Sequence, residues 1–200
     1  MIDERWVILG ALINFAGGLS YVIATVRGEA KPNRVTWFIW ALAPLIAFAA
    51  QVKQGVGIQS LLTFMVGFGP LMVFLASFVN KKAEWKLGHL DYICGGLSII
   101  GLVLWQLTGV GNLAISFSIL SDGLAGVPTI VKSYRFPETE NHWAYTAAWI
   151  SAFITLLTIE KWNFEHYGFP LYILAITSVF VLLIKFRLGK RLLQEDPKAK

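Results

Sequence analysis

One acidic side chain, Asp122, lies near the middle of a long apolar segment, where few charged residues are tolerated. A charge at the centre of a membrane-spanning helix costs at least ~2.5 kcal/mol, so an intramembrane carboxylate is a functional candidate by default. We expect Asp122 to be protonated at rest, because no Lys or Arg lies at its depth in any apolar segment. Such a carboxyl can contact a substrate, gate a path or carry a proton. The structural alternative is a neutral acid that only makes a hydrogen bond to a neighbouring helix.

Four other polar side chains are candidates for the same substrate or proton site. Ser121 is next to Asp122 in the chain, and Trp149 lies deep in another apolar segment, where an indole N–H needs a partner. Trp149 is explained equally well as a packing or lipid-facing residue. Asn14 and Ser20 lie in the first apolar segment, where hydrogen bonds in the helix core explain them as well as substrate contacts do.

A basic turn precedes two tryptophans in the stretch 31–40, KPNRVTWFIW. Pro32 breaks the helix there. Trp37 and Trp40 follow one turn apart, at the level of the lipid headgroups where indoles are enriched. We interpret the pair as a membrane anchor. The alternative is that one of them lines the inner mouth of a cavity.

The elements that carry these residues are membrane helices. Hydrophobic residues make up 56% of the 200 positions, charged residues make up 14%, and the mean hydropathy is +0.62, outside the range of ordinary soluble domains. A spanning helix needs about 20 mostly apolar residues. The chain therefore predicts an all-α membrane protein with seven transmembrane helices, at 6–26, 35–52, 56–79, 90–107, 112–131, 143–159 and 167–184.

Other classes of protein lack the residues that they require. The net charge of +5 would suit a nucleic-acid partner only if the basic residues formed one soluble face, and they lie between the apolar segments. The sequence has no paired histidines at metal spacing, no glycine-rich phosphate loop and no nucleophile with a base nearby in sequence. We therefore expect neither an enzyme nor a metal site, and no cofactor and no nucleic-acid partner.

The basic residues are divided unevenly between the two sides of the predicted bundle. The N-terminus and the second, fourth and sixth loops hold three of the 17 Lys and Arg, namely Arg5, Lys53 and Lys161. Lys and Arg in short loops are retained in the cytoplasm, so the N-terminus should lie outside and the C-terminus inside. We expect an integral protein of a prokaryotic inner or plasma membrane, in contact with the lipid bilayer. The sequence indicates no oligomeric state.

A repeat relates the two halves of the chain. Residues 18–32, GLSYVIATVRGEAKP, align with residues 123–137, GLAGVPTIVKSYRFP, with identities at five positions that include both final prolines. The predicted helices then form two parallel triple-helix repeats. Because three is odd, a linker helix must invert the second repeat. The predicted domains are the first repeat, the linker helix, the second repeat and a basic cytoplasmic tail, at 1–80, 81–110, 111–186 and 187–200.

This plan resembles the SWEET sugar transporters and the wider PQ-loop membrane proteins. The residues VPTIVKSYRFPETE, 127–140, resemble the second PQ-loop motif: Pro128 matches its proline, Lys132 its basic position, and Thr129 stands where the motif has glutamine. The resemblance implies that Pro44 and Pro128 act as hinges, as two members of the SWEET proline tetrad. Lys132 joins Trp37 and Trp40 as a candidate for the inner mouth of the cavity. The asparagines of the SWEET sugar site are missing here, so a sugar substrate is not implied.

Two functions follow from these observations. The first is a small-solute transporter or facilitator that works by alternating access, with its site between the repeats near Asp122 and Trp149, and with proton coupling if Asp122 titrates. Its substrate is a small molecule that the sequence does not name. The second is a non-transporting membrane receptor or scaffold on the same fold, whose basic turns bind acidic partners or lipid headgroups.

Overall fold

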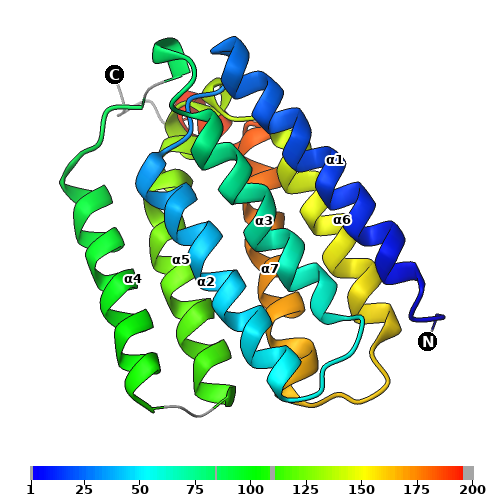
Figure 1. The fold of residues 1–200 in the computed structure, drawn as a ribbon. Coiled ribbons are helices and arrows are strands. Elements are labelled where there is room, and N and C mark those ends of the chain that lie inside the picture. Colours follow the sequence, from blue (N-terminus) through cyan, green and yellow to red (C-terminus); the bar gives the residue numbers. More distant parts are fainter. Residues whose placement is uncertain (1, 84, 109–110, 196–200) are drawn as a thin grey trace.

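The computed structural model describes residues 2–83, 85–108 and 111–195 (Figure 1). The protein is all-helical, with 81% helix and no strand in these ranges. The long helices are α1 Trp6–Arg27, α2 Arg34–Lys53, α3 Ser60–Ala76, α4 His89–Thr108, α5 Gly111–Arg135, α6 His142–Thr158 and α7 Phe164–Ile184. The short elements are the 3-10 turns η1 Lys81–Ala83 and η2 Pro137–Thr139 and the terminal helix α8 Leu188–Glu195.

Asparagine caps begin two of these helices. The Asn33 side chain accepts hydrogen bonds from the backbone N–H groups of Val35 and Thr36 at the start of α2. The Asn141 side chain accepts one from the backbone N–H of Trp143 at the start of α6. Asparagine is favoured at this position because its oxygen satisfies an N–H group that has no partner within the helix. The caps therefore fix the register of α2 and α6 after their turns.

Four helices within the described residues, α1, α2, α5 and α7, are long and apolar enough to cross a membrane. Helix α3 is also apolar but has 17 residues. Each of the helices α1 to α7 exposes large apolar side chains, for example Leu12, Phe38, Leu75, Ile93, Leu120, Phe153 and Leu171. Apolar surface of this extent is typical of contact with lipid or with another protein.

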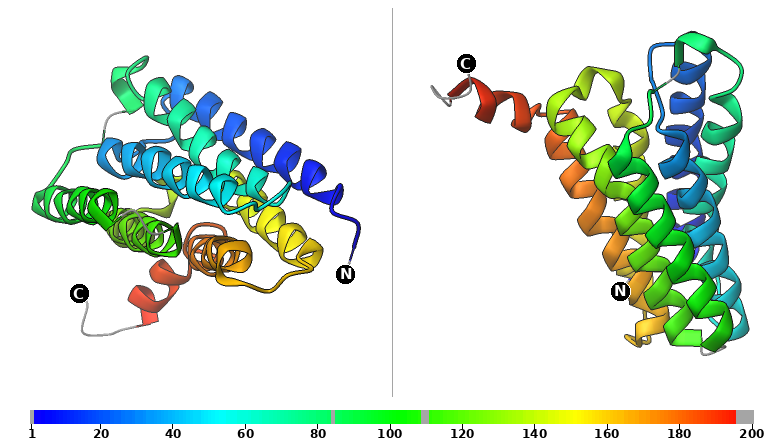
Figure 2. Two further views of the ribbon diagram at one scale, coloured as in Figure 1. Left: turned by 60° about the horizontal axis from the view of Figure 1, so that its bottom comes forward. Right: turned by 90° about the vertical axis from the view of Figure 1, so that its left-hand side faces the viewer.

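Successive long helices run in opposite directions (Figure 1). The N-terminus lies at one end of the bundle, and the C-terminus lies at the other end together with the α1–α2, α3–α4 and α5–α6 connections. Helix α8 projects from that second end (Figure 2), where Lys190 Nζ is 2.7 Å from Glu138 Oε2 of η2. The connections that carry most of the Lys and Arg residues thus share one end.

The helices form two triplets, α1–α3 and α5–α7, with α4 at the edge. In the first triplet α3 packs between α1 and α2, and in the second α7 packs between α5 and α6. The triplets meet where α1 packs on α6 and α2 packs on α5. A Cβ on Gly17 would lie 2.3 Å from the Ala147 Cβ, so the glycine permits the close approach of α1 and α6. Helix α4 packs against α5 and α2 on the outside (Figures 1 and 2).

Candidate functional site

A cavity of about 80 Å³ lies between the two triplets. Side chains of α1, α2, α3, α5, α6 and α7 line it, whereas no described residue of α4 does. Its lining is mostly apolar, and its polar side chains are few: Asn14, Asp122 and Thr177, with the polar atoms of Trp37, Trp40 and Tyr145. A mostly apolar pocket with a few convergent polar groups is the usual form of a small-molecule site.

Asp122 lies in the wall of this cavity and is 3% exposed. The Tyr172 hydroxyl of α7 donates a hydrogen bond of 2.6 Å to Oδ2, and the indole N–H of Trp40 donates one of 3.0 Å to the Asp122 backbone carbonyl. Oδ1 has no hydrogen-bond partner among the described residues. No described Lys, Arg or His lines the cavity. One oxygen of a buried acid is therefore left for a proton, water or ligand.

Four aromatic rings line the cavity beside Asp122: those of Trp37, Trp40, Tyr145 and Phe180. Trp40 makes edge contacts with Trp37 and Phe180 at centroid distances of 5.4 and 5.5 Å, and Tyr145 stacks on Phe180 at 4.6 Å. These contacts hold the rings in one cluster.

The interpretation of Trp37 and Trp40 as headgroup anchors is not what the structure shows. Their exposed fractions are 4% and 7%, and both line the cavity. The reason is the position of α2, which packs against α3, α4 and α5. Trp37 and Trp40 lie on its packed side, whereas Phe38 lies on the side that remains exposed. The alternative interpretation, a cavity-lining role, describes both residues.

Asn14 was expected at the site and does line the cavity. It is 7% exposed, and its Nδ2 has no hydrogen-bond partner among the described residues. Thr177 also lines the cavity, where its hydroxyl donates to the Ile173 backbone carbonyl at 2.6 Å. The indole N–H of Trp37, another lining residue, likewise has no hydrogen-bond partner among the described residues, so the lining holds two unpaired donors in addition to the Asp122 oxygen.

Ser121 does not share the site with Asp122. Its hydroxyl donates to the Ser98 carbonyl of α4 at 2.9 Å, and the Ser98 hydroxyl donates back to the Ser121 carbonyl at 2.7 Å. Consecutive residues of an α-helix point in directions about 100° apart. Because Asp122 faces the cavity, Ser121 faces α4 and joins it to α5.

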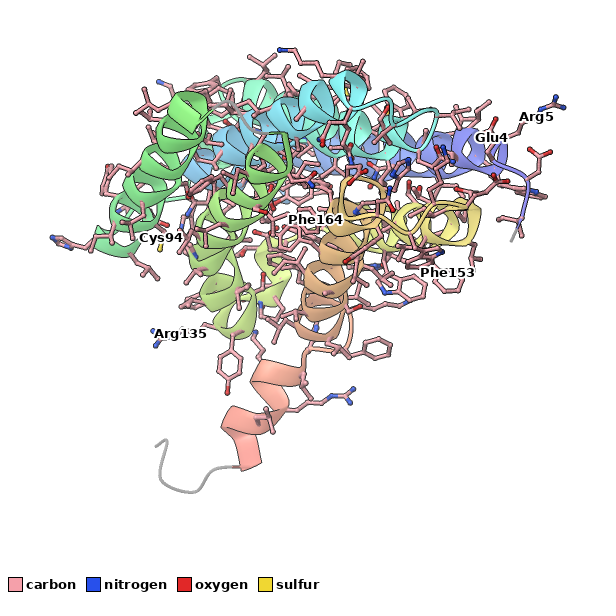
Figure 3. The ribbon with its side chains drawn as sticks, turned by 90° about the horizontal axis from the view of Figure 1, so that it is seen from below. Glu4, Arg5, Cys94, Arg135, Phe153 and Phe164 are labelled. Carbon is pink, nitrogen blue, oxygen red and sulfur yellow. The ribbon has the colours of Figure 1, made fainter. Side chains whose placement is uncertain are left out.

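Ser20 and Trp149 also lie outside the cavity lining. The Ser20 hydroxyl donates to the Gly17 carbonyl at 2.7 Å and accepts from the Asn141 amide at 3.4 Å. The Trp149 indole donates to the Ser178 hydroxyl of α7 at 2.8 Å and stacks on Phe153, which projects from the outer side of the bundle in Figure 3. Trp149 therefore has the packing role that the sequence left open.

Pro44 and Pro128 are buried inside α2 and α5, and neither lines the cavity. Pro70 of α3 does line it. Each proline removes one N–H group from its helix, so the backbone is weakened at these levels of the bundle.

A buried polar network lies next to the cavity, around Lys132 and Glu140. Lys132 Nζ is 2.6 Å from Glu140 Oε1, and the two side chains are 1% and 0% exposed. The hydroxyls of Tyr21 and Tyr145 donate to Glu140 Oε2 at 2.6 and 2.9 Å. Lys132 also donates to the Lys31 carbonyl. Tyr145 belongs both to this network and to the cavity lining, so the network bounds the cavity toward the α1–α2 and α5–α6 connections.

Sequence reasoning missed Tyr172, Tyr145, Tyr21, Thr177 and Glu140. Tyr172 is 50 residues from Asp122, so no local pattern connects them. Glu140 had a usable signal, because it follows Lys132 by eight residues, just beyond the end of α5, and has the opposite charge. Opposite charges that flank one helix end in an apolar chain are candidates for a buried pair.

No protein-family model matches this chain, and no curated protein or solved structure is significantly similar to it. The class of the molecule is therefore defined by its own structure, as an all-helical protein with helices long and apolar enough to cross a membrane and with a cavity between two helix triplets.

Proposed function

We propose that this protein is a small-solute membrane transporter or facilitator that works by alternating access between its two helix triplets. The observation that carries the proposal is the buried Asp122, with an unpaired oxygen, in a cavity lined by helices of both triplets. A site at the interface of two repeats, opened in turn to each side by their relative motion, is the common plan of secondary transporters.

The packing pattern supports an internal repeat. Within the triplets, α3 packs on α1 and on α2, just as α7 packs on α5 and on α6. Between the triplets, the first helix of each packs on the second helix of the other: α1 on α6, and α5 on α2. In this interpretation α4 is the inverting linker, and the architecture is that of the PQ-loop and SWEET proteins.

The caps suggest a register for the repeat that differs from the sequence alignment. Asn33 and Asn141 begin α2 and α6 in the same way, and matching them pairs Trp37 with Tyr145. Both of those residues line the cavity. Extending the alignment of 18–32 with 123–137 past the prolines, with one residue of slippage, pairs Trp37 with Trp143 instead. Trp143 is 60% exposed, so the environments of that pair differ.

Asp122 supplies the chemistry of the proposed cycle. When the cavity is closed, the carboxyl is surrounded by apolar and aromatic groups, and the described lining residues provide no cation. When either side opens, water reaches the carboxyl and stabilises its charged form, which allows proton exchange. A proton or a cation bound on one side can then be released on the other.

Counterflow in vesicles tests this proposal. Purified protein is reconstituted into liposomes loaded with an unlabelled solute, and entry of the labelled solute is followed for amines, amino acids, sugars and vitamins. We expect at least one solute to accumulate transiently above its level in protein-free liposomes. If several solutes bind and none enters, the chain is the non-transporting receptor or scaffold that the basic connections would also suit.

Orientation in the membrane gives a separate prediction. The C-terminus shares its end of the bundle with the connections that hold most Lys and Arg residues, so this end should be cytoplasmic. A reporter fused to the C-terminus should report cytoplasm, and one inserted between α4 and α5 should report the outside. Reporters that locate both positions on one side would remove a membrane crossing and, with it, the proposed repeat.

A further inference from the structure

We propose that the cavity binds a small organic ammonium ion, held by the Asp122 carboxylate and by the aromatic rings around it. This inference names the substrate class of the proposed transporter and so rests on the proposed function. Its observations are the charge of the lining, the ring cluster and the size of the cavity.

The Asp122 carboxylate is the counter-ion that an ammonium ion requires. Oδ2 already accepts a hydrogen bond from the Tyr172 hydroxyl, and Oδ1 has no hydrogen-bond partner among the described residues. No described residue that the neighbouring helices place around Asp122 and the cavity is positively charged. The polar groups there are Trp40 of α2, Tyr172 of α7, Tyr145 of α6 and Asn14 of α1. The α3 lining is Val66, Gly69 and Pro70, and α4 contacts the adjacent Ser121 through Ser98. An ionised Asp122 therefore has no cation among the described residues around it, and a bound cation can supply the missing charge.

The ring cluster favours an ammonium ion over a metal ion. Trp37, Trp40, Tyr145 and Phe180 line the same cavity as Asp122. Aromatic faces attract cations, and cages of such rings are the usual sites for quaternary and other organic ammonium ions. A hard metal ion would need several oxygen ligands, whereas Asp122 is the only carboxylate among the described lining residues.

The cavity volume limits the ligand. A cavity needs a volume of about 10–15 Å³ to hold one buried water. A cavity of about 80 Å³ therefore holds roughly five to eight non-hydrogen atoms. A sugar ring with its hydroxyls exceeds this size and would find few polar partners here. An anion would lack a positive partner in the described lining. The unpaired Asn14 amide can donate to an oxygen on the ligand, as in an amino alcohol.

Calorimetric titration of the purified protein tests the proposal with three probes: choline, tetramethylammonium, and 3,3-dimethyl-1-butanol, the uncharged analogue of choline. We expect both cations to bind at least about tenfold more tightly than the uncharged analogue. Cation binding should strengthen as the pH rises and Asp122 loses its proton, while binding of the analogue stays constant. Equal binding of choline and its analogue would overturn the proposal.

Variants locate the site. Asp122→Asn should weaken choline binding about tenfold or more without affecting the uncharged analogue. Trp37→Leu should weaken binding of both cations, whereas Trp149→Leu, which removes an indole outside the cavity, should not. Unchanged choline affinity in a folded Asp122→Asn variant would contradict the proposal.

The transport assay separates this inference from the proposed function. If the ammonium probes fail to bind but a neutral solute shows counterflow, the ligand class is wrong and the transporter remains. If choline binds at Asp122 but no solute shows counterflow, the ligand class holds and the transporter proposal fails.

Discussion

Asp122→Asn is expected to abolish the pH dependence of solute flux while leaving expression and melting temperature close to those of the wild type. The amide has nearly the same shape, and its oxygen can still accept the hydrogen bond of 2.6 Å from Tyr172. It cannot titrate or carry charge, so it cannot couple flux to protons. We expect flux in the variant to be constant from about pH 5 to pH 8, and the stability change to stay within about 1 kcal/mol.

A matched acid-to-amide change outside the cavity provides the control. Glu138 is 48% exposed and pairs with Lys190 at 2.7 Å, at the end of the bundle that holds the C-terminus. Exposed ion pairs contribute little, so Glu138→Gln should change neither flux nor its pH dependence. If Asp122→Asn keeps the wild-type pH profile, Asp122 serves structure only.

Breaking the buried pair of Lys132 and Glu140 is expected to cause the largest loss of stability. Lys132→Met leaves the Glu140 carboxylate buried without its cation. Glu140→Gln leaves the buried Lys132 ammonium without its counter-ion, among neutral groups such as the Lys31 carbonyl and the Trp85 ring, 4.6 Å from Nζ. Each single change should cost about 3–5 kcal/mol, because an unpaired charge is strongly disfavoured in a buried site. Melting curves in detergent would measure the loss.

The double variant shows whether the two residues act as a pair. Replacing both Lys132 and Glu140 removes both charges together, so Lys132→Met with Glu140→Gln should lose less than the sum of the single losses. Lys190→Met, which breaks the exposed pair with Glu138, should cost no more than about 1 kcal/mol. Additive losses in the double variant would mean that the buried contact contributes no coupling.

The sequence predicted where the helices begin and end better than it predicted which helices pack against one another. Apolar length and capping asparagines are local signals, so the predicted segment 35–52 agrees with α2 at Arg34–Lys53. The predicted segment 56–79 is longer than α3, Ser60–Ala76, because hydropathy does not distinguish apolar turn residues from helical ones. The composition of the chain also predicted its all-helical class.

The site was only partly predictable, because burial depends on which helices meet. Asp122 could be identified, since a carboxylate in an apolar segment is unusual wherever that segment packs. Ser121 and Trp149 gave similar signals but face α4 and α7. Their directions follow from the rotation of α5 and α6 about their axes, and tertiary packing sets that rotation. The same packing places Trp37 and Trp40 inside the bundle.

Solute flux under an imposed pH gradient, compared in vesicles that hold the wild type or Asp122→Asn, is the most direct test of transport through this cavity. Choline and a set of uncharged solutes would be measured, with protein-free vesicles for reference. We expect the wild type to move at least one solute at a rate that follows the gradient, and Asp122→Asn to lose this response. Wild-type vesicles that move no solute faster than protein-free vesicles, in either direction of the gradient, would contradict it.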